Sequence, residues 1–138
     1  MITVKATREG LLGQKTATGD VLDRKRPIVA LPSTKALDTF VRVVNPLNGK
    51  QQIALVDDVG PFNEHDDAYV FQPSTMLPPS TMDPRIEGVA YVPVRPQAES
   101  GVSVSGKGTN GAGIDLGEVV WAALGMLDNT DVQWEFVT

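Results

Sequence analysis

Apolar and polar residues alternate along much of this chain in short runs, a pattern typical of β-strands. The two clearest runs cover residues 39–44 and 52–56, where β-branched residues are abundant. The pair Asn48-Gly49 lies between them and favours the tight turn of a β-hairpin. Shorter runs of the same kind, each bounded by Gly, Pro, Asp or Asn, occupy residues 2–6, 27–31, 89–94 and 132–137. The pattern therefore predicts six short strands.

One segment near the C-terminus has helical periodicity instead. Apolar residues recur with the spacing of a single helix face at Leu116, Val119, Val120, Ala123, Leu124 and Leu127. Asp115 directly precedes this run and Glu118 follows three residues later, as in a capping box. We therefore expect a helix here with Asp115 as its N-cap. Several short strands with one helix indicate a mainly-β fold and a small barrel.

The length of the chain and a weakly patterned middle segment define the domain organisation. With 138 residues, of which 41% are hydrophobic, the chain is predicted to form one domain over residues 1–138. Between residues 63 and 111 prolines interrupt the pattern, and residues 99–113 are rich in Gly and Ser. We expect an insertion over 63–111 that builds one wall of a groove and ends in a mobile loop, because featureless connections of this length are unusual in compact domains.

Charge and composition narrow the classes of partner. The formal net charge of -5 argues against nucleic acid, which requires clustered basic residues. The absence of cysteine excludes disulfides and thiolate chemistry. No apolar run is long enough to span a bilayer, and the first residues resemble a strand rather than a signal peptide. We expect a monomer, and the sequence leaves its cellular location open.

Two aspartate motifs carry the candidate chemistry. Residues 57–62, DDVGPF, close a predicted strand, and residues 112–117, AGIDLG, contain Asp115. Glycines beside these acids allow close approach of the backbone, so the two motifs can meet in one groove. Two carboxylates in a cleft are the minimum equipment for cleaving a glycan.

Each aspartate also has a structural interpretation. As an N-cap, Asp115 would accept backbone hydrogen bonds that lower its pKa, whereas burial and a nearby acid would raise its pKa towards the range of a general acid. Asp57 and Asp58 are equally suited to bonding the backbone of a turn. Because consecutive strand residues face opposite sides, we expect only one of this pair to enter the groove. The sequence leaves both interpretations open.

The chain resembles rare-lipoprotein-A-like domains in the order of several short motifs. The matching residues are Ala6-Thr7 with Gly10, GQKTATGD at 13–20, ALP at 30–32, VRVVN at 41–45 with Asn48-Gly49, DVGPF at 58–62 and IDL at 114–116. That family is related to expansins, family-45 endoglucanases and lytic transglycosylases of the membrane-bound A type, all built on a double-psi β-barrel. The resemblance implies a six-stranded double-psi β-barrel and leaves the insertion outside it.

The resemblance also implies a mechanism. Asp115 matches the aspartate that protonates the glycosidic oxygen and then acts as a base, and Asp58 matches a polar residue lining the same groove. The resemblance implies a β-1,4 glycan substrate, in particular peptidoglycan, and the activity of a lytic transglycosylase without a cofactor. The alternative is a non-catalytic carbohydrate-binding or assembly module of the expansin type, associated with a phage or secretion apparatus.

Candidate substrate-binding residues surround these two acids. Flat aromatic rings can cover the apolar face of a sugar, which favours Phe62, Tyr69 and Tyr91, while Trp121 and Trp134 are assigned to the core. Asp57 and Glu9 are polar candidates, although Glu9 is also explained as an exposed strand residue. Residues 63–69 include the single histidine beside several acids, but neighbouring loop residues seldom converge on one ion, so we predict no metal site.

Overall fold

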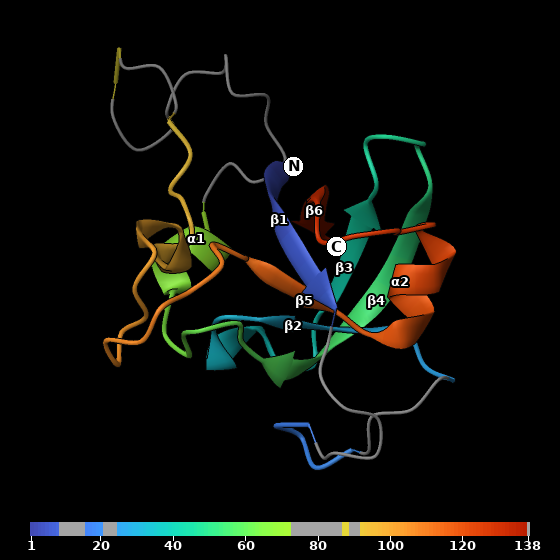
Figure 1. Cartoon of the computed structure of the whole chain (residues 1–138), viewed down its shortest axis with the longest axis horizontal. Coiled ribbons are helices and arrows are strands. Elements are labelled where there is room, and N and C mark those ends of the chain that lie inside the picture. The colour runs from blue at the N-terminus through green and yellow to red at the C-terminus, as the bar shows by residue number, and fades with distance from the viewer. Residues whose placement is uncertain (9–15, 21–24, 73–86, 89–91, 138) are drawn as a thin grey trace.

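The computed structural model describes residues 1–8, 16–20, 25–72, 87–88 and 92–137. Within these residues, six strands close into a barrel in the order β1-β5-β2-β4-β3-β6 (Figure 1). The strands are β1 (Ile2–Arg8), β2 (Ile28–Leu31), β3 (Phe40–Val44), β4 (Gln51–Val59), β5 (Ile114–Leu116) and β6 (Asp131–Phe136). The closed six-stranded barrel confirms the mainly-β fold class.

The strand pairing places β2 between the strands that carry the two aspartate motifs. The pairs β1/β5 and β2/β4 are parallel, and the other four pairs are antiparallel. The first three strands and the last three have the same pairing scheme: if β1 is exchanged with β4, β2 with β5 and β3 with β6, every pair of neighbouring strands remains a pair of neighbours. As a result, β4 and β5 flank β2 on its two sides.

The hydrophobic core fills the interior of the barrel. Alternate residues of the strands point inward and are almost completely buried, as the predicted strand pattern requires. The inward set consists of Ile2, Val4, Ala6, Val29, Leu31, Val41, Val43, Ala54, Val56, Ile114, Leu116, Val132 and Trp134. Trp134 is a core residue, whereas Trp121 is only partly buried and lies beneath the guanidinium of Arg8, 5.8 Å from its ring.

The predicted hairpin is confirmed. Strands β3 and β4 pair antiparallel from Phe40↔Leu55 to Val44↔Gln51. Gly49, with φ of 74°, adopts the left-handed conformation that the turn between them requires.

The start of the C-terminal helix differs from the prediction. Helix α2 (Glu118–Ala123) begins three residues after Asp115, its N-cap is Gly117, and no side chain caps it. Asp115 lies in the middle of β5 instead, because that segment pairs with both β1 and β2. Tertiary strand pairing thus overrides the local helical pattern at the first apolar position of the run, Leu116.

The strand predicted at residues 89–94 is absent from its described part. Residues 89–91 lie outside the described residues, and 92–94 are irregular. The backbone of Val94 is hydrogen-bonded to the side-chain amide of Gln72 rather than to a neighbouring strand. This amide donates to the Val94 carbonyl at 2.9 Å and accepts from the Val94 N–H at 2.8 Å. The strand that completes the barrel in its place is β5, where the sequence pattern predicted no strand.

The described part of the 63–111 insertion packs beside the barrel. It contains α1 (Asp67–Val70) and the 3-10 turn η2 (Gln97–Ser100), on the side away from α2 (Figure 1); a second 3-10 turn, η1 (Thr34–Ala36), follows β2. The Asp66 carboxylate accepts a 2.8 Å hydrogen bond from the backbone N–H of Gln97 and joins α1 to η2. In the Gly/Ser-rich tract, the Ser103 N–H donates to the Lys107 carbonyl at 2.7 Å, closing a hydrogen-bonded turn.

Candidate functional site

The two aspartate motifs meet in one row of residues across the barrel. Ala30 in β2 pairs with Asp58 of β4 on one side and with Asp115 of β5 on the other. Asp115 in turn pairs with Thr7 of β1. The row therefore runs Asp58, Ala30, Asp115, Thr7, and residues in such a row project from the same face of a sheet.

This row faces outward from the barrel. Its neighbours in sequence, among them Val29, Leu31, Ile114 and Leu116, point into the core. Because adjacent strands lie about 4.8 Å apart, the Cα atoms of Asp58 and Asp115 are separated by about 10 Å. Ala30, between them, has a small side chain and is itself buried.

A β-bulge brings Asp58 into this row. The register between β2 and β4 shifts between Val29, which pairs with Val56, and Ala30, which pairs with Asp58. The extra residue on β4 is Asp57, which breaks the strict alternation of the strand. Simple alternation would have placed Asp58 on the core face with Val56, and the bulge places it in the outward row instead.

Asp115 is mostly buried and has a single side-chain donor among the described residues. The Thr7 hydroxyl donates a hydrogen bond to its Oδ1, while Oδ2 faces Gly60, where a Cβ would lie 3.7 Å away. Burial raises the pKa of Asp115 to about 6; the Thr7 hydrogen bond lowers it and the Asp58 charge raises it. A carboxyl with such a pKa can exchange a proton near neutral pH.

Two glycines allow β5 to pack tightly on either side of Asp115. A Cβ on Gly113 would come within 2.7 Å of Pro96 and 2.8 Å of the Tyr69 hydroxyl. A Cβ on Gly117 would lie 2.8 Å from the carbonyl oxygen of Ile28. The spacing of glycines in AGIDLG is therefore required by close contacts, as the sequence indicated.

Asp57 is buried and its carboxylate is hydrogen-bonded within the protein. The prediction that it contacts substrate is therefore wrong, and its role is structural. Its side chain is 1% exposed. It accepts hydrogen bonds from the hydroxyls of Thr18 at 2.5 Å and Thr16 at 3.2 Å, and Arg26 lies 3.4 Å away. Asp57 thus holds residues 16–18 against β4.

Asp58 is half-buried and remains next to Asp115. Its Oδ1 accepts two backbone hydrogen bonds of 2.9 Å, from Ala17 and Val59. These two hydrogen bonds fix the orientation of the Asp58 carboxyl beside Asp115.

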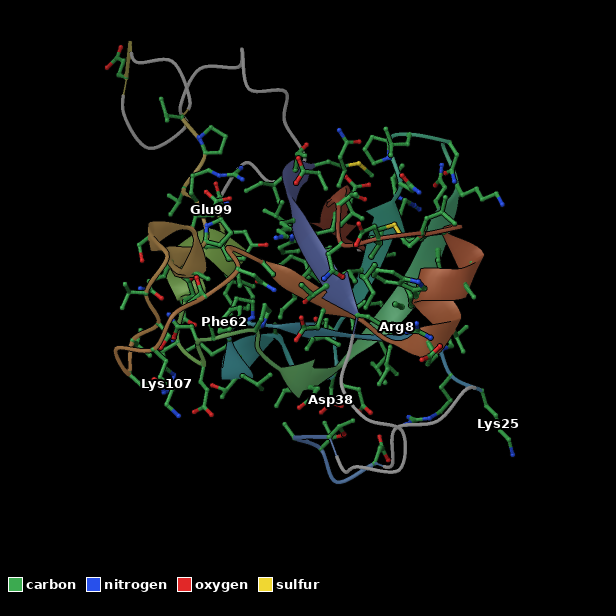
Figure 2. All side chains as sticks on the ribbon, in the orientation of Figure 1. Arg8, Lys25, Asp38, Phe62, Glu99 and Lys107 are labelled. Carbon is green, nitrogen blue, oxygen red and sulfur yellow. The ribbon has the colours of Figure 1, made fainter. Side chains whose placement is uncertain are left out.

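A cavity of about 370 Å³ adjoins this row at Gly60. Its lining consists of Val59, Gly60, Phe62, Asn63, Glu64, His65 and Val104. Phe62 follows β4 (Figure 2). It is 38% exposed and has a φ of 64°, an unusual backbone conformation for a large side chain. Val104 belongs to the segment 63–111, so this segment supplies part of the cavity wall.

Tyr69 does not belong to the surface of this site. Its ring is completely buried, its hydroxyl donates to the Gly113 carbonyl at 2.9 Å, and it accepts from the Trp134 indole at 2.8 Å. The prediction that Tyr69 stacks on a sugar is therefore wrong. The other two predicted binding residues, Glu9 and Tyr91, lie outside the described residues.

Sequence reasoning missed two contributors to the site. Thr7 was part of a matched motif, but only the pairing of β1 with β5 reveals its bond to Asp115. Val104 stands in an irregular tract with no periodic signal. Among the described residues, no group of three or more His, Asp or Glu side chains could hold a metal ion, and no helix is long and apolar enough to cross a membrane.

Comparison with known proteins identifies a family without an assigned activity. No curated protein matches the chain. Among solved structures, the chain is similar to a Streptomyces papain inhibitor, with 17% identity, a TM-score of 0.49 and coverage of 99% of this chain and 94% of that one. A family model matches residues 1–135, and the chain belongs to that family, described as Domain of unknown function (DUF8814).

Proposed function

We propose that the outward row of Thr7, Asp115 and Asp58 is a glycan-cleaving site in which Asp115 is the general acid and base. The observation that carries this proposal is the environment of Asp115. Its carboxyl is mostly buried, has one hydroxyl donor, lies in register with a second acid, and has a pKa raised to about 6. The sequence resemblance supplies the substrate class, a β-1,4 amino-sugar strand such as peptidoglycan.

The two oxygens of Asp115 are suited to different tasks. Thr7 donates to Oδ1, so the acidic proton is placed on Oδ2, which faces Gly60 and the side of the cavity. Transfer of this proton to the glycosidic oxygen accompanies cleavage of the bond to the anomeric carbon. The ionised Asp115 then removes the proton of the sugar's 6-hydroxyl, whose oxygen attacks the anomeric carbon. This sequence restores the acid and forms a 1,6-anhydro sugar without water.

Asp58 supports this mechanism as a fixed charge. Because its Oδ1 already accepts two backbone N–H groups, it is poorly placed to act as a mobile base. Its charge instead raises the pKa of Asp115 and would stabilise the positive charge that develops on the sugar ring. A mechanism with one acid that also serves as the base therefore fits better than a two-carboxylate hydrolysis.

A non-catalytic, expansin-like binding module is the second candidate function. The engagement of Asp58 with the backbone favours it, since only one carboxyl is left for chemistry. Both candidates use the same outward face and predict glycan binding, so only turnover separates them.

Digestion of purified sacculi tests the proposal. The wild-type protein should release anhydro-muropeptides, detected by mass, and Asp115→Asn should reduce the release by at least about 100-fold, the usual contribution of a general acid. Asp128→Asn removes the same charge from an exposed residue outside the site and should leave the release unchanged. Equal release by Asp115→Asn would contradict the assignment, whereas binding to sacculi without any release by the wild type would favour the module.

A further inference from the structure

The cavity beside Asp115 has the size and position of a ligand subsite. Its volume of about 370 Å³ lies within the usual range for small-molecule pockets, roughly 300–1,000 Å³. Asp115 does not line the cavity, but Gly60 lines it and also lies against Asp115 Oδ2, so a ligand longer than one sugar unit that fills the cavity can extend past Gly60 to the reacting group. The positive φ of Gly60, 142°, strongly disfavours other residues, so this position next to Asp115 carries no side chain.

Two apolar groups line the cavity from different parts of the chain. Phe62 follows β4 and is 38% exposed, and Val104 in the insertion is 67% exposed. Phe62 holds an uncommon positive φ, a conformation that tends to occur at ligand-binding positions. An exposed aromatic face with an aliphatic group in the same cavity suits the apolar face of a sugar ring.

The charge of the cavity is negative. Glu64 is exposed, and its carboxylate has no hydrogen-bond or ion-pair partner in the part of the chain that the structure describes. Asp115 and Asp58 lie beyond Gly60 and add to the same field. Of the nearby cations, Lys35 is paired with Asp67 at 3.3 Å.

Another cation, Lys107, belongs to the insertion. Lys107 is exposed on its outer turn (Figure 2). It does not line the cavity, whose lining contains one acidic residue, Glu64, and neither lysine nor arginine. The cavity therefore favours a cationic ligand over an anionic one.

We propose that this cavity binds an amino-sugar unit whose C2 amine is free, next to the bond that Asp115 cleaves. Phe62 stacks on the ring and Glu64 pairs with the ammonium group. An N-acetylated unit lacks this charge, and a unit bearing a carboxylate would be repelled. The inference rests on the proposed function for the position of the cleaved bond, and it names the substrate as a partly de-N-acetylated strand.

Calorimetric titration with two defined oligosaccharides tests the proposal. β-1,4-linked tetramers of glucosamine and of N-acetylglucosamine are compared in an Asp115→Asn background, at about pH 6 and about 0.1 M salt, so that no turnover intervenes. The glucosamine tetramer should bind about fivefold more tightly. Glu64→Gln should weaken its binding by about two- to fivefold, the range of an exposed ion pair, and leave the acetylated tetramer unchanged. Phe62→Ala should weaken both tetramers by about two- to tenfold.

Controls separate the cavity from general attraction of cations to an acidic protein. Asp128→Asn removes an exposed charge outside the cavity and should not alter the preference. Equal or tighter binding of the acetylated tetramer would overturn the proposal, as would equal effects of Asp128→Asn and Glu64→Gln, or equal binding of tetralysine. A retained preference with no wild-type cleavage of sacculi would refute the cleavage mechanism alone. Cleavage without the preference would refute the subsite alone.

Discussion

Replacing Asp115 with asparagine should change the pH dependence of stability in a direction fixed by its environment. Burial raises the pKa of Asp115 from 3.8 to about 6, so the folded protein holds this proton over a range in which the unfolded chain has lost it. The contribution of this group to the free energy of unfolding therefore falls as pH rises from about 4 to about 6. Above that range the full penalty of the buried charge remains.

The expected size follows from the shift. Each pKa unit corresponds to about 1.4 kcal/mol, so a shift of about two units costs about 3 kcal/mol when Asp115 is ionised. That is a large part of the 5–15 kcal/mol that typically stabilises a domain. Asparagine keeps the shape and can still accept the Thr7 hydrogen bond through its Oδ1, but it carries no charge.

Urea unfolding of the two proteins between about pH 4 and pH 8 measures this effect. The stability of Asp115→Asn minus that of the wild type should increase with pH and reach up to about 3 kcal/mol at pH 8. Subtraction removes contributions of other acids, such as Asp67, whose pKa is lowered by its hydrogen bond with Ser33. A difference that does not vary with pH, or that decreases as pH rises, would refute the reasoning.

Two further substitutions test the packing and hydrogen bonding around Asp115. Gly113→Ala should lower the free energy of unfolding by about 1–3 kcal/mol, because its Cβ would come within 2.8 Å of the Tyr69 hydroxyl. Gly108→Ala is the control: its Cβ would have no atom within 4 Å, so the free energy of unfolding should change by less than about 1 kcal/mol. Equal effects of the two substitutions would contradict the close contact at Gly113. Thr7→Val should raise the pKa of Asp115 further, followed by NMR titration of its carboxyl carbon, because a donor to the ionised form is lost, and Thr7→Ser should restore it.

Most of the barrel could be predicted because its strands carry local signals. The β3–β4 hairpin combines β-branched runs with a turn residue, Gly49, whose conformation few other residues adopt. The segment around Leu116 could not be assigned in this way. Its apolar residues fit a helix face, but Leu116 itself lies in β5 and pairs with both β1 and β2 to complete the barrel. The local sequence around Leu116 carries no signal for a pairing partner that lies more than 80 residues away in the chain.

The candidate site was predictable in its residues more than in its geometry. Asp115 and Asp58 were identified from their glycine-flanked motifs, but their alignment depends on the bulge at Asp57. A bulge shifts every later side chain by one position, and a pattern of alternation cannot anticipate it. The prediction for Tyr69 was wrong for a related reason. Its buried hydroxyl is hydrogen-bonded to Gly113 and Trp134, which are remote in sequence.

The placement of Asp115 in a strand rather than at a helix start determines the sign of its pKa shift. As an N-cap it would accept backbone N–H groups at the positive end of α2, and its pKa would fall below 3.8. In β5 the Gly117 N–H donates to the Ile28 carbonyl instead, so burial raises the pKa of Asp115, the Thr7 hydroxyl opposes this shift, and the charge of Asp58 adds to it. If Asp115 were an N-cap, its contribution to the free energy of unfolding would decrease as pH falls. As a buried strand residue, its contribution decreases as pH rises. The same urea titration therefore tests the secondary structure of this segment and the capacity of its carboxyl to act as an acid.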